Sequence, residues 1–216
     1  MKTSSLNFAT AVFLMVGLAI PAQAIADSPK AGALGANPLS EQSILYDPEV
    51  PALGNPKGDI TIVEYFDYRC PYCKKVHPEI LKVAKEDGGV RVVFKDWPVF
   101  GGVSVYAARL VIASRFQNKQ AAAHEVLIST QQKLSEGVVD RLLTDAGIDV
   151  DRAKQDLAAH QATVDGILAR NHAQGEALGF QGTPAFIIGH FRVPGALDAA
   201  TFKQAIAEAR AANKKK

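Results

Sequence analysis

Residues 60–74 read Ile-Thr-Ile-Val-Glu-Tyr-Phe-Asp-Tyr-Arg-Cys-Pro-Tyr-Cys-Lys, an apolar run that leads directly into two cysteines. β-branched and aromatic residues are typical of strands, so residues 60–66 predict a buried strand. Proline is favoured at the first position of a helix, so Pro71 predicts that a helix begins at the cysteine pair and runs to about Glu86. The expected local structure is therefore a strand that ends in a helix carrying both sulfurs.

Cys70 and Cys73 are the only two cysteines of the chain. A structural disulfide stabilises a protein mainly by closing a long loop of the unfolded chain. A bond between residues three apart closes almost no loop, so it would contribute little stability. The pair is therefore predicted to be chemically active.

The helix start predicts different properties for the two sulfurs. Free backbone N–H groups and the positive end of the helix dipole meet at Cys70, and both favour a thiolate over a thiol. Thiols in such positions have pKa values of roughly 3.5–7.5. We therefore expect Cys70 to be the exposed attacking sulfur, and Cys73, one turn further on, to be the buried resolving sulfur.

The sequence after this helix predicts a second strand and then a long helical region. Gly88 and Gly89 end the helix, and residues 90–94 form a strand parallel to the first, since strand–helix–strand units favour a right-handed parallel crossover. Residues 101–179 have apolar residues at three- and four-residue spacings, which predicts an inserted bundle of about four helices. Its expected breaks lie near Asn118, Ser135, residues 147–149 and His160.

The C-terminal part returns to strand character. Residues 185–189 predict a strand, and residues 191–193 predict a hairpin partner for it. A last helix is expected over residues 198–212, with Asp198 as its N-cap. Residues 213–216 are then a short basic tail.

The N-terminus has the pattern of a secretion signal. Lys2 is followed by an apolar run from Phe8 to Ile20, a proline and small residues, which predicts a signal peptide over residues 1–26. The small residues place the cut after Ala24 or Ala26. The apolar run is shorter than the roughly 20 residues that span a bilayer, which argues against an uncleaved anchor. The mature protein is expected in the periplasm, with residues 27–58 as an extended lead-in that contains one short helix around Leu39 to Leu45.

Composition limits the possible functions. The net charge of +2 gives no reason to expect a nucleic-acid partner, and 48% hydrophobic residues are enough for a real core. A mature chain of this length suits one domain.

Three features together resemble one known family. Residues 66–74, the helical region at 101–179 and Gly182-Thr183-Pro184 look like the DsbA-like branch of the thioredoxin superfamily, over about Gly54 to Ala212. The resemblance implies an α/β class: a thioredoxin fold with a helical-bundle insertion between the second strand and the cis-proline strand. The corresponding domain would be residues 59–212.

The resemblance also implies an activity and a site. It implies an extracytoplasmic thiol:disulfide oxidoreductase that introduces disulfides into secreted proteins by exchange at Cys70 and Cys73, without a cofactor. Glu64 would be a buried acid that relays a proton to Cys73. The substrate-binding residues would be Thr183 and Pro184, joined by a cis peptide bond, together with Pro71 and Tyr72.

The implied partners are reduced or unfolded secreted proteins and a membrane redox protein. That protein would be a DsbB-like oxidase or a DsbD- or ScsB-like reductant, and the chain itself is expected to be a monomer. An alternative function is a disulfide isomerase or reductase that is kept reduced, a role in which threonine often precedes the cis-proline, as Thr183 does here.

A second alternative comes from a different class of protein. Cys70, Cys73 and His77 form a C-x2-C-x3-H pattern that could bind a metal ion, with a distant histidine as fourth ligand. A second paired motif, which structural zinc sites normally have, is missing from the sequence. His77 is interpreted as a packed or half-exposed helix residue, the alternative being an electrostatic neighbour of the cysteine pair. Lys74 and Lys75 are interpreted as part of a solvated helix face, the alternative being a source of positive potential near the thiolate. The other histidines have no motif around them.

Overall fold

A computed structural model describes residues 37–215, so the predicted signal peptide lies outside the described residues. A five-stranded sheet with the order β1-β3-β2-β4-β5 forms its centre. The strands are β1 (Ala52–Gly54), β2 (Ile60–Phe66), β3 (Val90–Asp96), β4 (Ala185–Ile188) and β5 (Phe191–Pro194). The helices that flank the sheet are α1 (Glu41–Leu45), α2 (Pro71–Asp87) and α8 (Ala199–Asn213).

The strand pairing follows the prediction, with one addition. β2 and β3 are parallel and joined through α2, and β4 and β5 form the antiparallel hairpin. β1 was not predicted. It pairs antiparallel with β3, and Leu53 lies opposite Val92. Its sequence, Ala-Leu-Gly, carries no β-branched residue, so only the free edge of β3 makes it a strand.

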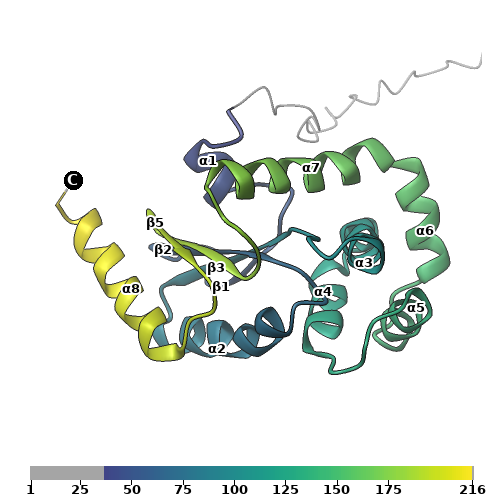
Figure 1. Cartoon of the computed structure of the whole chain (residues 1–216), viewed down its shortest axis with the longest axis horizontal. Helices are drawn as coiled ribbons and strands as arrows, with labels where there is room; N and C mark the ends of the chain where they lie inside the picture. Colours follow the sequence, from purple (N-terminus) through teal and green to yellow (C-terminus); the bar gives the residue numbers. More distant parts are fainter. Residues whose placement is uncertain (1–36, 216) are drawn as a thin grey trace, which may run out of the picture. The chain divides into compact units, whose positions relative to one another are not determined.

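Each face of the sheet has its own core, as Figure 1 shows by the helices on either side. Ile62 and Phe66 of β2 belong to the core on the side of α2 and α8. Val63 and Tyr65 point to the other face and pack with residues of α1. Because both faces are covered, every residue of β2 is buried, as the unbroken apolar run predicted.

The helical insertion has five α-helices, not about four. They are α3 (Gly102–Ala113), α4 (Gln120–Ser129), α5 (Glu136–Asp145), α6 (Val150–Ala159) and α7 (Gln161–Ala177), with a 3-10 turn at Ser114–Gln117. The predicted breaks are confirmed: Asn118 adopts a left-handed conformation, and Ser135 and Asp149 are N-caps. Four breaks divide the region into five helices, and the sequence-based count missed one.

The short helix expected in the lead-in is confirmed as α1, and the chain just after it is tied to the sheet. Asp47, just after α1, is 1% exposed and forms an ion pair of 3.0 Å with Lys95 of β3. Arg170 of α7 reaches the same carboxylate at 2.8 Å. Breaking a buried ion pair strongly destabilises the fold, because the remaining charge is then buried without a partner. Residues around Asp47 are therefore an integral part of the folded unit.

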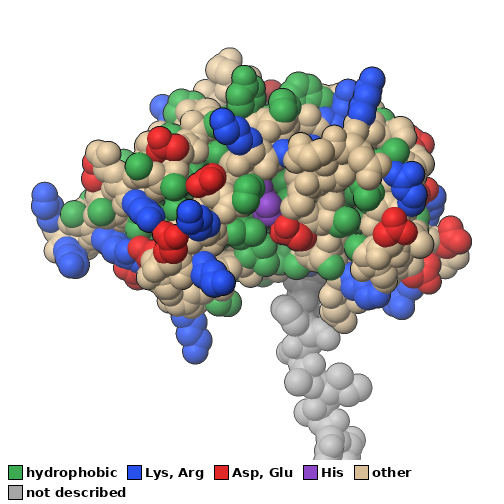
Figure 2. All heavy atoms as spheres, turned by 90° about the horizontal axis from the view of Figure 1, so that it is seen from below, with side chains coloured by type: hydrophobic (Ala, Val, Ile, Leu, Met, Phe, Trp, Pro, Cys, Tyr) green, Lys and Arg blue, Asp and Glu red, His purple; other side chains and the backbone are tan. Residues whose placement is uncertain are grey.

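The surface that lies on the side of α2 carries mixed charge. In Figure 2 basic and acidic side chains are interspersed with apolar ones on this face, so neither sign dominates it. No helix within residues 37–215 combines the length and apolar character needed to cross a membrane.

Candidate active site

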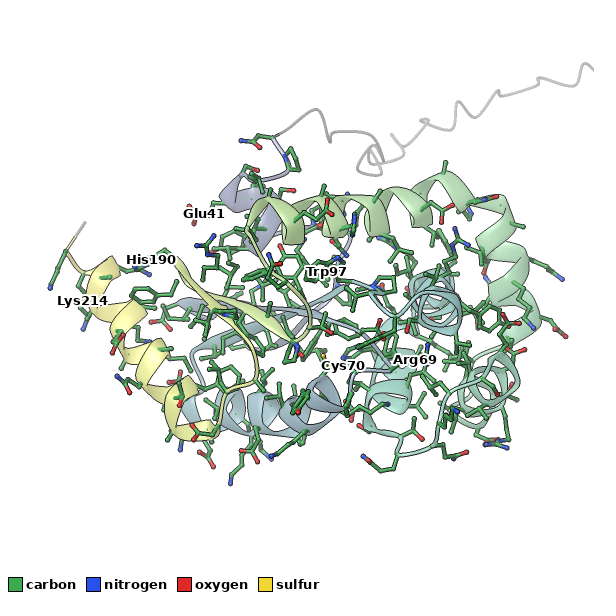
Figure 3. The ribbon with its side chains drawn as sticks, in the orientation of Figure 1. Glu41, Arg69, Cys70, Trp97, His190 and Lys214 are labelled. Carbon is green, nitrogen blue, oxygen red and sulfur yellow. The ribbon has the colours of Figure 1, made fainter. Side chains whose placement is uncertain are left out.

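Cys70 is the N-cap of α2, directly after β2 and a short turn. Its Sγ accepts a hydrogen bond from the backbone N–H of Cys73 at 3.4 Å, and Pro71 follows in the first turn. Figure 3 shows the sulfur at the beginning of α2, with Arg69 beside it. The predicted placement of the cysteine pair at a helix start is confirmed.

The prediction that Cys70 is exposed is wrong. Its residue is 1% exposed, and Cys73 is 0% exposed. The Thr183–Pro184 segment lies against it, and the Cys70 Sγ donates a hydrogen bond of 3.3 Å to the Thr183 carbonyl oxygen. The helix start gives no sign of this cover, because the covering loop is more than one hundred residues away in the sequence.

The surroundings of Cys70 favour its thiolate. Interaction with the Cys73 side chain lowers the pKa of Cys70 to about 6. Burial acts in the opposite direction, while the Thr183 side chain and the backbone N–H groups of Cys73 and Tyr72 lower the pKa further. At neutral pH most of Cys70 is therefore ionised, since the pH exceeds this pKa by about one unit.

Cys73 has the opposite surroundings. Burial raises the pKa of the Cys73 thiol, and interaction with Cys70 and the negative charge of Glu64 raise it further. Glu64 is 1% exposed, as predicted, and burial raises the pKa of its carboxyl well above the ordinary value. An interaction with the Cys73 side chain acts against that rise. Glu64 Oε1 has no hydrogen-bond partner among the described residues.

The remaining predicted site residues gather around the sulfurs. The Thr183–Pro184 peptide bond is cis, which confirms that prediction, and Pro184 is buried beside the start of β4. Tyr72 is 62% exposed and Pro71 is also exposed at the start of α2. The structure thus brings together a buried sulfur pair, a backbone carbonyl and an exposed aromatic ring.

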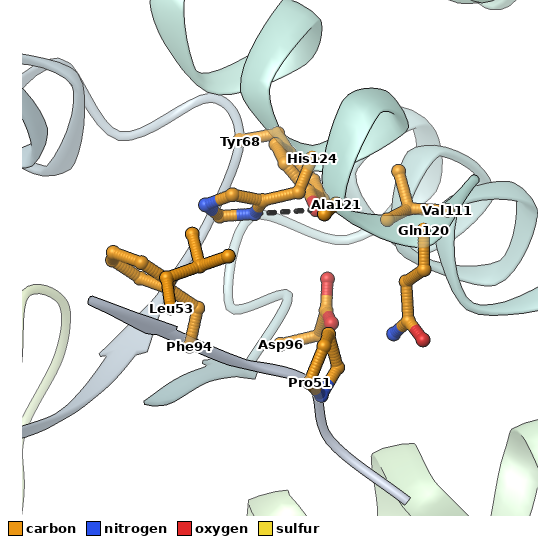
Figure 4. Close-up of a pocket in the computed structure, with 9 residues that line it drawn as sticks. All are labelled: Pro51, Leu53, Tyr68, Phe94, Asp96, Val111, Gln120, Ala121 and His124. Carbon is orange, nitrogen blue, oxygen red and sulfur yellow. Dashed lines mark hydrogen bonds between the residues drawn. The ribbon is translucent and has the colours of Figure 1, made fainter. Parts of the chain in front are cut away.

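A buried polar cluster next to this site was missed by the sequence analysis. Tyr68 Oη and His124 Nδ1 are 3.1 Å apart (Figure 4), and both side chains are buried. Together with Asp96 they line a cavity of 10 Å³, and roughly 10–15 Å³ is the smallest space that holds one water molecule. Burial raises the pKa of Asp96 to about 8. His124 has no sequence motif around it, so no signal in the chain pointed to it.

His77 is packed, as interpreted from the sequence. It is 1% exposed, and its Nε2 lies 2.9 Å from Glu125 Oε2. Within residues 37–215 no group of three or more His, Cys, Asp or Glu side chains is arranged to hold a metal ion. Cys70, Cys73 and His77 therefore do not form such a group. The metal-binding alternative therefore has no geometric support in the described part of the chain.

Most of the chain matches one known protein family. The model described as thioredoxin matches residues 47–208, about three quarters of the chain.

Solved structures of related proteins agree with this match. A thioredoxin-like oxidoreductase from Silicibacter pomeroyi is 37% identical, with a TM-score of 0.76, and covers 80% of this chain and 98% of its own. The thiol-disulfide exchange protein alpha-DsbA2 from Wolbachia pipientis is 25% identical, with a TM-score of 0.71, covering 77% and 90%. A periplasmic thioredoxin-like protein from Salmonella enterica serovar Typhimurium is 27% identical, with a TM-score of 0.66, covering 79% and 95%.

Curated relatives include much longer proteins. A Na(+)/H(+) antiporter, NhaA 3 of Salinispora tropica, is 27% identical over 66% of this chain. The chain spans 22% of that antiporter's length, so the likeness concerns only part of the antiporter.

Proposed function

The chain belongs to the thioredoxin family, among its DsbA-like thiol-disulfide exchange proteins, and from this membership we propose that it is an extracytoplasmic protein disulfide oxidoreductase. In this function the oxidised Cys70–Cys73 pair donates its disulfide to reduced secreted proteins. The observation that carries the proposal is the position of Cys70 Sγ at the start of α2, where it accepts the Cys73 N–H.

The proposed reaction has two exchange steps. A substrate thiolate attacks Cys70 Sγ, which forms a mixed disulfide and breaks the bond to Cys73. Cys73 takes up a proton, and Glu64 is the nearby buried acid that we propose as its donor. A second substrate thiolate then attacks the substrate sulfur of the mixed disulfide, so that the substrate is oxidised and Cys70 leaves as a thiolate. A thiol of low pKa leaves faster, which favours transfer to the substrate.

Substrate binding is proposed to use the loop that covers Cys70. Thr183 and Pro184 would offer backbone groups to an extended substrate, and Pro71 and the exposed Tyr72 would contact it next to the sulfur. After donation, a membrane redox protein would re-oxidise the pair. No cofactor is needed in this exchange, since thiolates and disulfides balance each step.

The test is a comparison of the oxidised and reduced proteins at pH 7. Because the helix start stabilises the thiolate only after the disulfide opens, the reduced form should unfold at a higher denaturant concentration than the oxidised form. If the oxidised form is clearly the more stable one, the donor role fails and the chain is better described as a reductase or isomerase.

The location and partners are part of the proposal. The signal-like residues 1–26 and the periplasmic relative from Salmonella support a periplasmic location, and a monomer is proposed with it. Fractionation of cells with N-terminal sequencing should find the mature chain in the periplasm, cut after Ala24 or Ala26. A chain that stays in the cytoplasm with residues 1–26 attached would contradict this. Mixed disulfides trapped on Cys73→Ala in cells should contain secreted proteins and the membrane partner.

A further inference from the structure

Two helices of the insertion have no charged residue of their own to stabilise the end that faces the redox motif. Within α3, Gly102–Ala113, the first turn has no acidic residue, and its N-cap Gly101 supplies no side-chain hydrogen bond. Within α4, Gln120–Ser129, the last turn has no basic residue. The free N–H groups at a helix start and the free C=O groups at a helix end need partners, and opposite charges stabilise them.

Asp67, three residues before Cys70, reaches the start of α3. It is 1% exposed, and its Oδ1 accepts hydrogen bonds from the Ser104 hydroxyl at 2.7 Å and from the Arg69 N–H at 2.7 Å. Its Oδ2 accepts from the Phe100 N–H at 3.0 Å. One carboxylate therefore joins the turn before the sulfurs to the loop and the first turn that begin the insertion.

Lys74, directly after Cys73, reaches the end of α4. Its Nζ donates to the carbonyl oxygen of Leu127 at 2.8 Å and is 3.5 Å from that of Ile128. The side chain is half-buried, so the interpretation of Lys74 as part of a solvated helix face is wrong. Burial lowers the pKa of Lys74 to about 8, and negative charge on Cys73, Asp67 and Cys70 opposes that fall.

From these contacts we propose that Asp67 and Lys74 are positioning residues that form a charge clamp, docking the inserted helices on the redox motif. Asp67 holds the loop before α3 and the Ser104 hydroxyl in its first turn, and Lys74 caps the end of α4. Each charge has the sign that the helix dipole favours at that end. Lys74 directly follows Cys73, and its backbone N–H closes the first turn of α2 on the Cys70 carbonyl oxygen at 3.2 Å. An ammonium bound to the α4 carbonyls therefore belongs to the same helical turn as the sulfurs, and the clamp couples the docking of α4 to the reactivity of Cys70. The second part of the proposal rests on the redox function proposed above.

The lysine arm is tested with a matched pair of variants in the full chain. Lys74→Met and Lys75→Met remove the same charge from neighbouring residues of α2, but Lys75 is exposed. In Lys74→Met, amide hydrogen exchange in the last turn of α4 should become faster. The equilibrium with glutathione should shift toward the protein disulfide by about two- to fivefold, the effect of one charge–dipole contact. Lys75→Met should change neither quantity, and Lys74→Arg should restore both.

The aspartate arm has its own variants. Asp67→Asn should speed exchange in the loop 97–101 and the first turn of α3, and Ser104→Ala, which removes one donor without changing charge, should do so to a smaller extent. If Asp67→Asn does not fold, Ser104→Ala still tests the contact between Asp67 and α3. If exchange in these two segments is as slow in Ser104→Ala as in the wild type, the aspartate arm is wrong.

The outcomes separate this proposal from the redox function. Equal effects of Lys74→Met and Lys75→Met on exchange and on the glutathione equilibrium would overturn the clamp, because net charge alone would then explain them. If the wild type forms no reversible disulfide with glutathione, the redox function fails. The exchange comparison still decides the docking in that case, since it does not depend on the sulfurs cycling.

Discussion

The surroundings of Cys70 and of Cys73 differ although the two sulfurs lie one helical turn apart. Both residues are buried, so exposure does not distinguish them. Both belong to the same hydrophobic core. Cys70 meets N–H donors at the start of α2, whereas Cys73 lies beside the carboxyl of Glu64. The comparison teaches that two equally buried sulfurs can differ in charge. At Cys70 the Cys73 side chain and the N–H donors outweigh the cost of burial, whereas at Cys73 burial dominates.

The largest expected effect is the difference in reactivity between the two variants that each keep a single cysteine. In Cys73→Ala the remaining Cys70 should react with iodoacetamide at pH 7 on the order of 100-fold faster than Cys73 does in Cys70→Ala. The reason is that the backbone N–H groups at the start of α2 and Thr183 still favour the Cys70 thiolate without the Cys73 side chain, while the pKa of Cys73 is raised by burial. Alkylation rates followed by mass spectrometry measure the difference. Equal rates would remove the distinction between the two sulfurs.

The next effect concerns the carboxyl beside Cys73. Glu64→Gln should slow closure of the Cys70–Cys73 disulfide from a Cys70–glutathione mixed disulfide, on the order of 100-fold if Glu64 accepts the Cys73 proton. Stopped-flow release of glutathione measures this step. Asp96→Asn is the matched control, because it also neutralises a buried carboxyl on the same face of the sheet. Asp96 lies opposite Phe66, two residues after Glu64 in β2, and side chains two residues apart share a face. A Glu64→Gln rate no slower than that of Asp96→Asn would exclude the relay.

The buried Asp96 should affect stability more than chemistry. Its pKa is about 8 in the folded protein and 3.8 in the unfolded chain, so the folded state holds an extra proton between these values. Stability from this group is therefore present below pH 3.8 and is lost as the pH rises toward 8. Asp96→Asn removes this loss and should raise the free energy of unfolding at pH 7 on the order of 2 kcal/mol. Urea unfolding at pH 5 and pH 7 tests it, and a less stable variant at pH 7 would contradict it.

The smallest effect is the pH dependence of the reduced protein. Interaction with the Cys73 side chain, helped by Thr183 and backbone N–H donors, outweighs burial and lowers the pKa of Cys70 from 9.0 to about 6. The contribution of this group to stability is therefore full above pH 9 and is lost as the pH falls through 6. At pH 7 the reduced form gains about 1.4 kcal/mol from this group, equivalent to about 30 mV of potential. Unfolding of both redox forms at pH 5 and pH 7 measures it. A reduced-minus-oxidised difference that is the same at both pH values would contradict the assignment.

Local patterns in the sequence were sufficient for most elements. The strand at Ile60–Phe66 and the helix that begins at Pro71 follow from residues that are neighbours in the chain. The same holds for the helix after Asp198, whose carboxylate accepts the Thr201 N–H as an N-cap. Strand propensity, proline at a helix start and capping act over a few residues, so a single sequence contains them.

Contacts between distant segments were decided only by the tertiary structure. The cover over Cys70 by Thr183, the strand β1 on the edge of β3, and the pair of Asp47 with Lys95 each join residues far apart in the chain.

By itself, the sequence determined that a strand runs into a cysteine pair at a helix start and that a helical insertion precedes the Thr183–Pro184 strand. Only the tertiary structure decided that both sulfurs are buried, and that Asp67 and Lys74 point to the ends of α3 and α4. The physical reason is that backbone propensities depend on near neighbours. Burial and the partner of each polar group depend instead on which distant segments pack together, and no local pattern contains that information.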